Sequence, residues 1–230
     1  MIRNLKALGL ALIAVFAIGA VMVASASATL GHLTSTRTGV ETFGTGSDTG
    51  AEDALHKFGS TLTCTHDTFI FGKYNSTKEP GVHNPLILPA STVTVTPFYT
   101  GCSSGSEPAT VTMNGCDFVF HLTDGKVDLI CPVGKVVEIH RYSNAHNHAT
   151  GISNCTTTIK PKTGMGTLTY KNLAGGDVEV NGTITGLTVE SHGACSFGFT
   201  IENSEGTYTL LEDIVEGEDT AGNPVSVHVG

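Results

Sequence analysis

The sequence predicts an all-β protein, an antiparallel β-sandwich preceded by a signal peptide helix. Short runs rich in Thr, Val, Ile and Phe recur along the chain, and many alternate apolar and polar residues with the period of a half-buried strand. Gly, Asn, Asp or Pro interrupts these runs at short intervals, as turns between strands require. After the amino-terminal region, no stretch keeps helical spacing over three turns.

The amino terminus has the pattern of a secretory signal peptide. Arg3 and Lys6 form a positive head, residues 7–23 carry no charge, and alternating Ala and Ser at 24–28 offer A-x-A cleavage sites. A membrane anchor is the alternative reading. The uncharged run of 17 residues is shorter than the roughly 20 that cross a bilayer, and no basic cluster follows it. We therefore expect cleavage after residue 28 or close to it.

Charge limits the range of partners. The chain has 12 Lys and Arg against 21 Asp and Glu, and removal of residues 1–28 takes away two cations and leaves a net charge of −11. A phosphate backbone must be met by cations, so nucleic acid is not an expected partner. The same charge disfavours binding to anionic membranes, and we expect a secreted protein with no membrane association after signal cleavage.

Composition divides the mature chain into two parts. Residues 29–54 are rich in Gly, Thr and Ser with few apolar residues, which predicts a flexible arm or at most one loose strand. Residues 55–230 are predicted to form the β-sandwich domain, with an immunoglobulin-like or jelly-roll-like architecture. This length suffices for one large core, and two smaller stacked halves are an open alternative.

One hairpin can be predicted residue by residue. Asp124 and Gly125 supply the positive φ of a tight turn. Counting outward in steps of two places Cys116, Phe118, Phe120 and Leu122 on one face, opposite Val127, Leu129 and Cys131. His121, Asp117 and Asp128 then lie on the opposite, wetter face.

All six cysteines lie after the signal peptide, and an even count in an exported chain predicts disulfides. A zinc site is disfavoured because the chain has no C-x-x-C pair. Six cysteines allow 15 pairings. We expect Cys116 with Cys131 across the hairpin, Cys155 with Cys195 at two strand starts in the later half, and Cys64 with Cys102.

Cysteine placement also supports a family resemblance. Segments 58–64, 93–102 and 109–116 each end on a cysteine, the last of them as Met113-Asn114-Gly115-Cys116, and Cys131 lies in segment 130–135. This order resembles a group of exported actinobacterial proteins of unknown function, over roughly residues 55–200. The resemblance implies a secreted, disulfide-bonded β domain and carries no known activity.

Two patterns suggest chemistry that their context disfavours. Residues 101–105 match the G-x-S-x-G esterase motif, but that motif needs a helix after the serine, and here Cys102 is expected in a disulfide and Pro108 follows. We predict a loop. His146 and His148 would share a face in an extended chain and could bind Zn²⁺ or Cu²⁺ with His140 or Asp128. Because their segment is polar and predicts a solvated loop, we expect no stoichiometric metal.

The acidic residues near the carboxyl terminus do not form a clear catalytic or calcium-binding pattern. Glu212 and Glu216 would share a strand face roughly 13 Å apart, farther than the carboxylates of a glycoside hydrolase. The chain also has no Trp for sugar stacking. Calcium binding by residues 216–219, or by Ser47 and Asp48, lacks a defined loop pattern.

The sequence therefore predicts a secreted, disulfide-stabilised β-sandwich that is not an enzyme, needs no cofactor and acts as a binding or structural module outside the cell or at its surface. Its expected ligand is extracellular, a cell-wall component or polysaccharide. The alternative is an extracellular hydrolase of glycans or esters that uses His and carboxylate residues. A buried cleft around His140 and an acidic residue would favour the enzyme, and a flat threonine-rich sheet face would favour the binding module.

Overall fold

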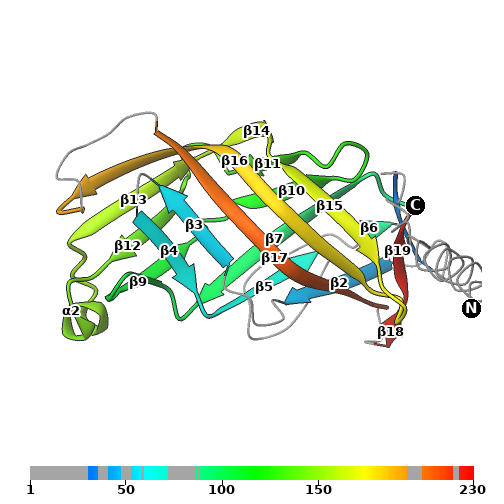
Figure 1. Ribbon diagram of the computed structural model, residues 1–230, viewed down its shortest axis with the longest axis horizontal. Coiled ribbons are helices and arrows are strands. Elements are labelled where there is room, and N and C mark those ends of the chain that lie inside the picture. Colours follow the sequence, from blue (N-terminus) through cyan, green and yellow to red (C-terminus); the bar gives the residue numbers. More distant parts are fainter. Residues whose placement is uncertain are drawn as a thin grey trace, which may run out of the picture.

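The computed structural model describes residues 31–35, 41–47, 53–57, 60–71, 86–87, 89–195, 204–219 and 223–230. These residues form an antiparallel, sandwich-like all-β fold with one short helix, which confirms the predicted fold class (Figure 1). The expected signal peptide helix over residues 1–28 lies outside the described residues. Within the described residues, no helix is long and apolar enough to span a membrane.

The first half of the fold consists of β1 (Leu33–Ser35), β2 (Glu41–Ser47), β3 (Asp53–Lys57), β4 (Ser60–Cys64), β5 (His66–Phe71), β6 (Leu86–Ile87), β7 (Thr92–Thr100), β8 (Ser103–Ser104), β9 (Glu107–Thr112) and β10 (Asp117–His121). The second half consists of β11 (Val127–Ile130), β12 (Val137–Arg141), α2 (Ala145–Thr150), β13 (Cys155–Lys160), β14 (Lys162–Met165), β15 (Thr167–Asn172), β16 (Val178–Gly193), β17 (Ser204–Glu218), β18 (Pro224–Val225) and β19 (Val227–Val229).

The two longest strands, β16 and β17, join the two ends of the fold. They pair with each other along most of their length and run diagonally across the molecule in Figure 1. The early part of β16 pairs with β15 and its late part with β13, while β17 pairs with β3 and then with β2. All strands except β1 and β19 thereby belong to one 17-stranded sheet.

The core lies between β17 and the strands that face it across the sandwich. Tyr208 of β17 stacks on Phe118 of β10, with ring centroids 6.3 Å apart, and meets Tyr99 of β7 edge-on at 6.1 Å. The buried apolar side chains form one continuous cluster that extends along both ends of the fold. Burial of this apolar surface is the main force that closes the sheet on itself.

The predicted hairpin is confirmed in its register and in its faces. Phe118 pairs with Leu129 and Phe120 with Val127, and all four side chains are buried. Gly125 has φ +69° at the turn, and its N–H donates to the carbonyl of His121. The alternation of apolar residues therefore predicts this part of the core correctly, because a strand exposes every second residue to the same side.

Residues 29–54, expected to form a flexible arm, contain strands in the structure. The structure places β1, β2 and the first residues of β3 in this segment, and β2 pairs with β17, β5 and β6. Gly weakens the strand signal that Thr gives this segment. It forms strands because neighbouring strands offer unpaired backbone groups, which is a tertiary effect on local preference.

Three disulfides join Cys64 to Cys102, Cys116 to Cys131 and Cys155 to Cys195, the same pairs that the sequence predicts. They close loops with sequence separations of 38, 15 and 40 residues. Three disulfides suit a protein of an oxidising, extracellular environment.

Candidate binding face

The candidate site is the outer face of four neighbouring strands, β9, β12, β13 and β16. The strand registers align two rows of side chains across this face. The first row contains Thr110, His140, Thr156 and His192. The second row contains Thr112, Glu138, Thr158 and Glu190. We call these eight residues the threonine–histidine face.

Alternation along each strand explains why these side chains point outward. In β12, Val137, Ile139 and Arg141 are buried, while Glu138 and His140 between them are only partly buried. The same period turns Cys155, Thr157 and Ile159 of β13 inward and leaves Thr156 and Thr158 outside. Neighbouring strands lie about 4.8 Å apart and alternate residues about 6.7 Å apart, so the rows form a regular grid of polar groups.

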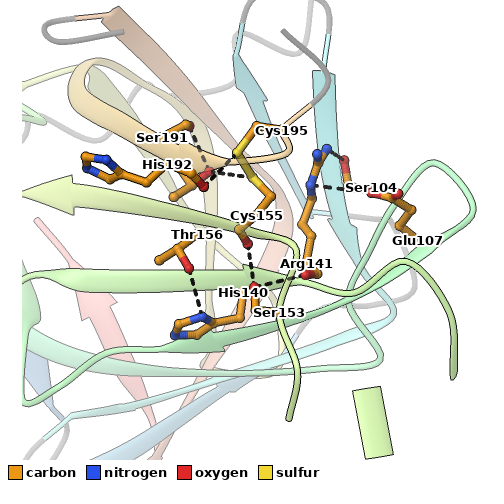
Figure 2. Close-up of a disulfide and its surroundings, with 11 residues drawn as sticks. Ser104, Glu107, His140, Arg141, Ser153, Cys155, Thr156, Ser191, His192 and Cys195 are labelled. Atoms are coloured by element: carbon orange, nitrogen blue, oxygen red, sulfur yellow. Dashed lines mark hydrogen bonds and ion pairs between the residues drawn. A yellow bond between two sulfur atoms is a disulfide. The ribbon is translucent and has the colours of Figure 1, made fainter. Parts of the chain in front are cut away.

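Polar contacts hold two histidines in the first row of the grid. His140 Nδ1 lies 3.2 Å from Thr156 Oγ1 (Figure 2). Its Nε2 lies 3.5 Å from Glu138 Oε2. His192 Nε2 lies 2.7 Å from Glu190 Oε1. The face thus carries two His–Glu pairs with the threonines of β13 between them.

Lys160 adds the main positive charge beside this face. Its Nζ lies 2.7 Å from Glu190 Oε2. The hydrogen bond from Lys160 is the main cause that lowers the pKa of the Glu190 carboxyl, with smaller effects from the charges of Lys160 and His192. Glu190 is therefore ionised at neutral pH and remains an acceptor for donors on a ligand.

His140 is placed differently from the catalytic histidine of a cleft enzyme. Its side chain is 29% exposed on the open outer face of the sheet. The carboxylate beside it, Glu138, is 40% exposed on the same open face. This arrangement corresponds to the threonine-rich sheet face that would favour a binding module.

The inner side of the same strands holds a polar layer that was not predicted from the sequence. Arg141 is buried, with its Nε 3.6 Å from Glu107 Oε2 and its guanidinium donating to Ser104 Oγ at 3.2 Å (Figure 2). Thr157 and Ser191 meet at 2.9 Å near the Cys155–Cys195 disulfide. The alternation of buried residues along β12, counted from Val137, could have predicted that Arg141 is buried. This layer closes the end of the core, which is a structural role.

The esterase-like segment, predicted as a loop, contains a short strand and the turn of a hairpin. β8 pairs with β9, Gly105 takes φ +63° between them, and a strand follows where the motif needs a helix. Cys102 is bonded to Cys64, and Ser104 accepts the hydrogen bond from Arg141. Neither serine stands on the strand–turn–helix support that activates the nucleophile of an esterase.

A loop was expected around His146 and His148, but these residues belong to helix α2. Asn144 caps the helix by accepting from the Asn147 N–H, and Gly151 ends it with φ +72°. Positions two apart on a helix point to nearly opposite sides, so the two imidazoles diverge. His148 packs against Tyr142, with ring centroids 4.9 Å apart. Among the described residues, no group of three or more His, Cys, Asp or Glu is placed to hold a metal ion.

The acidic carboxyl-terminal segment divides between the two faces of β17. Glu216 is exposed and Asp213 is 2% exposed. Asp219 accepts from the backbone N–H of Asn223 at 2.9 Å and thereby closes a turn. The side chain of Glu212 and all of Asp48 lie outside the described residues, so the distance expected between Glu212 and Glu216 stays a prediction.

A second polar cluster joins β10, β11 and β14. His121 Nε2 lies 2.9 Å from Asp128 Oδ2, and Asp128 Oδ1 accepts from the Gly164 N–H at 2.7 Å. Burial raises the pKa of Asp128, but the Gly164 N–H and His121 more than offset it, and the pKa is lowered overall. Both residues lie on the wetter face, as the hairpin predicts.

Comparison of the chain with protein-family models, with curated proteins and with solved structures found no match. The resemblance to exported actinobacterial proteins therefore stays a prediction.

Proposed function

We propose that this protein is a secreted, non-enzymatic binding module that acts outside the cell or at its surface, and that its threonine–histidine face binds an extended polysaccharide. The observation that carries the proposal is the pair of aligned rows across four strands. They present hydroxyl, imidazole and carboxylate groups at the regular spacing of a sheet.

The chemistry of the face suits a ligand rich in hydroxyl groups. A threonine hydroxyl both donates and accepts, a carboxylate accepts and an imidazole can do either, so each sugar hydroxyl finds a partner. The charge of Glu190 is balanced by Lys160, and Glu138 beside His140 is the second carboxylate of the face. Such a face fits a neutral chain better than a polyanion.

Two further features support action outside the cell. The amino-terminal pattern at residues 1–28 predicts export, and the three disulfides suit an oxidising compartment. An exported chain would begin near Ser27 or Thr29, which the intact mass of protein from the culture medium measures directly. Recovery of the full 230-residue chain in membranes would contradict export.

The binding test uses pull-down with insoluble cell-wall and polysaccharide fractions. The variant Thr156→Val with Thr158→Val removes two central hydroxyls at nearly constant side-chain shape. The matched control is Thr92→Val with Thr94→Val, two exposed positions with the same spacing on β7. We expect the first variant to lose bound protein several-fold and the control to bind like the wild type. Equal binding by all three proteins would refute the role of the face.

The second candidate function is an extracellular hydrolase of glycans or esters. It is favoured by the His121–Asp128 pair, because a carboxylate that orients an imidazole is a common part of a general base. The test is release of reducing sugar or acid from the same fractions by the wild type and by His121→Gln. Turnover that the variant loses would replace the binding proposal with the enzyme.

A further inference from the structure

A polar hollow opens where β14 bends into β15 over the middle of β16. Its volume is about 520 Å³, and its lining consists of two lysines, four threonines, three glycines and Met165. Small-molecule sites commonly have volumes of roughly 300 to 1,000 Å³. The hollow shares no residue with the threonine–histidine face, so what it binds is a separate question.

Backbone geometry that favours glycine shapes the hollow. Gly166 has φ +59° at the bend, and a Cβ there would lie 2.5 Å from the Thr183 carbonyl oxygen. Gly186 has φ +81° within a register shift between β16 and β17. Such a β-bulge changes the direction of nearby groups, and bulges are frequent beside functional sites.

Two lysines are held at the hollow by carbonyl groups from these two glycines. Lys126 Nζ donates to the Gly166 carbonyl at 2.9 Å, and Lys162 Nζ donates to the Gly186 carbonyl at 2.7 Å. An ammonium group has three donors, so after this bond each lysine keeps two for a ligand. Anchoring lowers the entropy that a flexible lysine would lose on binding.

The charge around the hollow favours an anion. No residue described as lining it carries a carboxylate, although the whole chain has a net charge of −9. The nearby Asp128 already accepts from His121 and from the Gly164 N–H. Asp124 accepts from the Lys126 backbone N–H. Both ammonium groups are therefore directed to backbone carbonyls and remain available to a negatively charged group.

We propose that this hollow binds an anionic sugar, a hydroxylated ring with one carboxylate or phosphate group. Lys126 and Lys162 would contact the charged group, and the threonine hydroxyls would meet the ring hydroxyls. A lone phosphate fills only a small part of 520 Å³ and leaves those hydroxyls to water. The carboxylate and the phosphate share this chemistry, and the experiment distinguishes them.

The ligand test is isothermal titration of the mature protein at low salt with four probes: glucuronate, glucose 6-phosphate, glucose and inorganic phosphate. We expect at least one of the two charged sugars to bind about tenfold more tightly than glucose and than inorganic phosphate. Glucuronate alone would assign the carboxylate, and glucose 6-phosphate alone would assign the phosphate. Phosphate binding as tightly as both sugars, or no binding of either sugar, would overturn the proposal.

Variants place the binding at the hollow. Lys126→Gln with Lys162→Gln should weaken binding of the charged sugar at least tenfold, and Lys135→Gln, an exposed position in the β11–β12 turn, should leave it unchanged. Gly164 lines the hollow, has φ +68°, and has open space where a Cβ would lie. Gly164→Asp should abolish binding through charge repulsion, while Gly164→Asn, of the same shape, should keep most of it, since both side chains tolerate this φ.

These paired variants also guard against loss of folding. Each is checked by its melting temperature, and a misfolded lysine variant leaves the comparison of Gly164→Asp with Gly164→Asn as the test. Equal affinity of that pair, or undiminished affinity of a folded double lysine variant, would refute the assignment. Neither outcome bears on polysaccharide binding by the threonine–histidine face, which the Thr156 and Thr158 variants test separately.

Discussion

Replacing both Cys116 and Cys131 with alanine measures how much a single short covalent loop contributes to this fold. The disulfide closes a loop with a sequence separation of 15 residues. Loop-closure entropy for that length corresponds to about 3 kcal/mol of stability at 25 °C. In a domain of this size, 1 kcal/mol shifts the melting temperature by roughly 2 to 4 °C. The expected decrease is therefore about 6 to 12 °C.

The hairpin should survive this change. Phe118 still faces Leu129 and Phe120 still faces Val127, and these buried pairs keep the strand register without the covalent bond. Alanine is the replacement of choice because Cys116 is 0% exposed, and a serine hydroxyl there would be buried without a designed partner. Far-ultraviolet circular dichroism of the variant should match that of the wild type.

Thermal and urea unfolding of the wild type and the double variant provide the measurement. The Cys155–Cys195 disulfide is the internal comparison, because its separation of 40 residues predicts a larger loss of about 4 kcal/mol. A decrease below about 2 °C for the shorter loop would refute the entropy argument. Non-reducing peptide mapping gives a direct check, and a peptide linking Cys102 to Cys116 would show that the pairing itself is wrong.

Three further predictions test other parts of the structure. Gly125→Ala should lower the free energy of unfolding by more than the roughly 1 to 2 kcal/mol that a left-handed alanine costs, because its Cβ would lie 2.4 Å from a backbone carbonyl oxygen. Gly134 has φ +75° and open space around it, so Gly134→Ala should show only that conformational cost. Urea unfolding of both variants measures the difference. The pKa of Asp128 is lower in the folded protein than its unfolded value near 3.8. Its carboxylate therefore stabilises the fold above pH 3.8, and this contribution is lost as the pH falls through the folded pKa. Asp128→Asn should reduce the fall in melting temperature between about pH 5 and pH 2. The Tyr170 hydroxyl is buried without a hydrogen-bond partner among the described residues, and burial, with a smaller effect of the Asp124 charge, raises its pKa well above 10. Tyr170→Phe should be as stable as the wild type or about 1 kcal/mol more stable, and should lose less stability above pH 10, and a clear loss at neutral pH would reveal a partner for the hydroxyl.

The local sequence pattern predicted the structure correctly where it depends on residues close together in the chain. The Asp124–Gly125 turn and the alternation on both sides of it determine which residues of β10 and β11 face the core. They also bring Cys116 next to Cys131. The physical reason is short range, because a two-residue period and a tight turn leave only one register that buries both sets of apolar side chains.

The local sequence pattern did not predict structure that depends on pairing with a distant strand. Residues 41–47 contain two glycines and no Val or Ile, which weakens their strand signal, and they form β2 because β17 and β5 pair with them. A bulge in β17 opposes Leu210 to Gly182 and Asp213 to Val180, so one extra residue reverses the alternation and buries Asp213. The period of the sequence contains no sign of that extra residue.

The sequence by itself determined the strand-rich class, the expected export and the hairpin core, because composition and alternation are properties of adjacent residues. Only the tertiary structure decided the two candidate sites. His140 and His192 share a row because β13 pairs with both β12 and β16, and Lys126 and Lys162 meet at one hollow because β11 pairs with β14. Strand order and register between distant segments depend on burial of the whole core, and no local period encodes them.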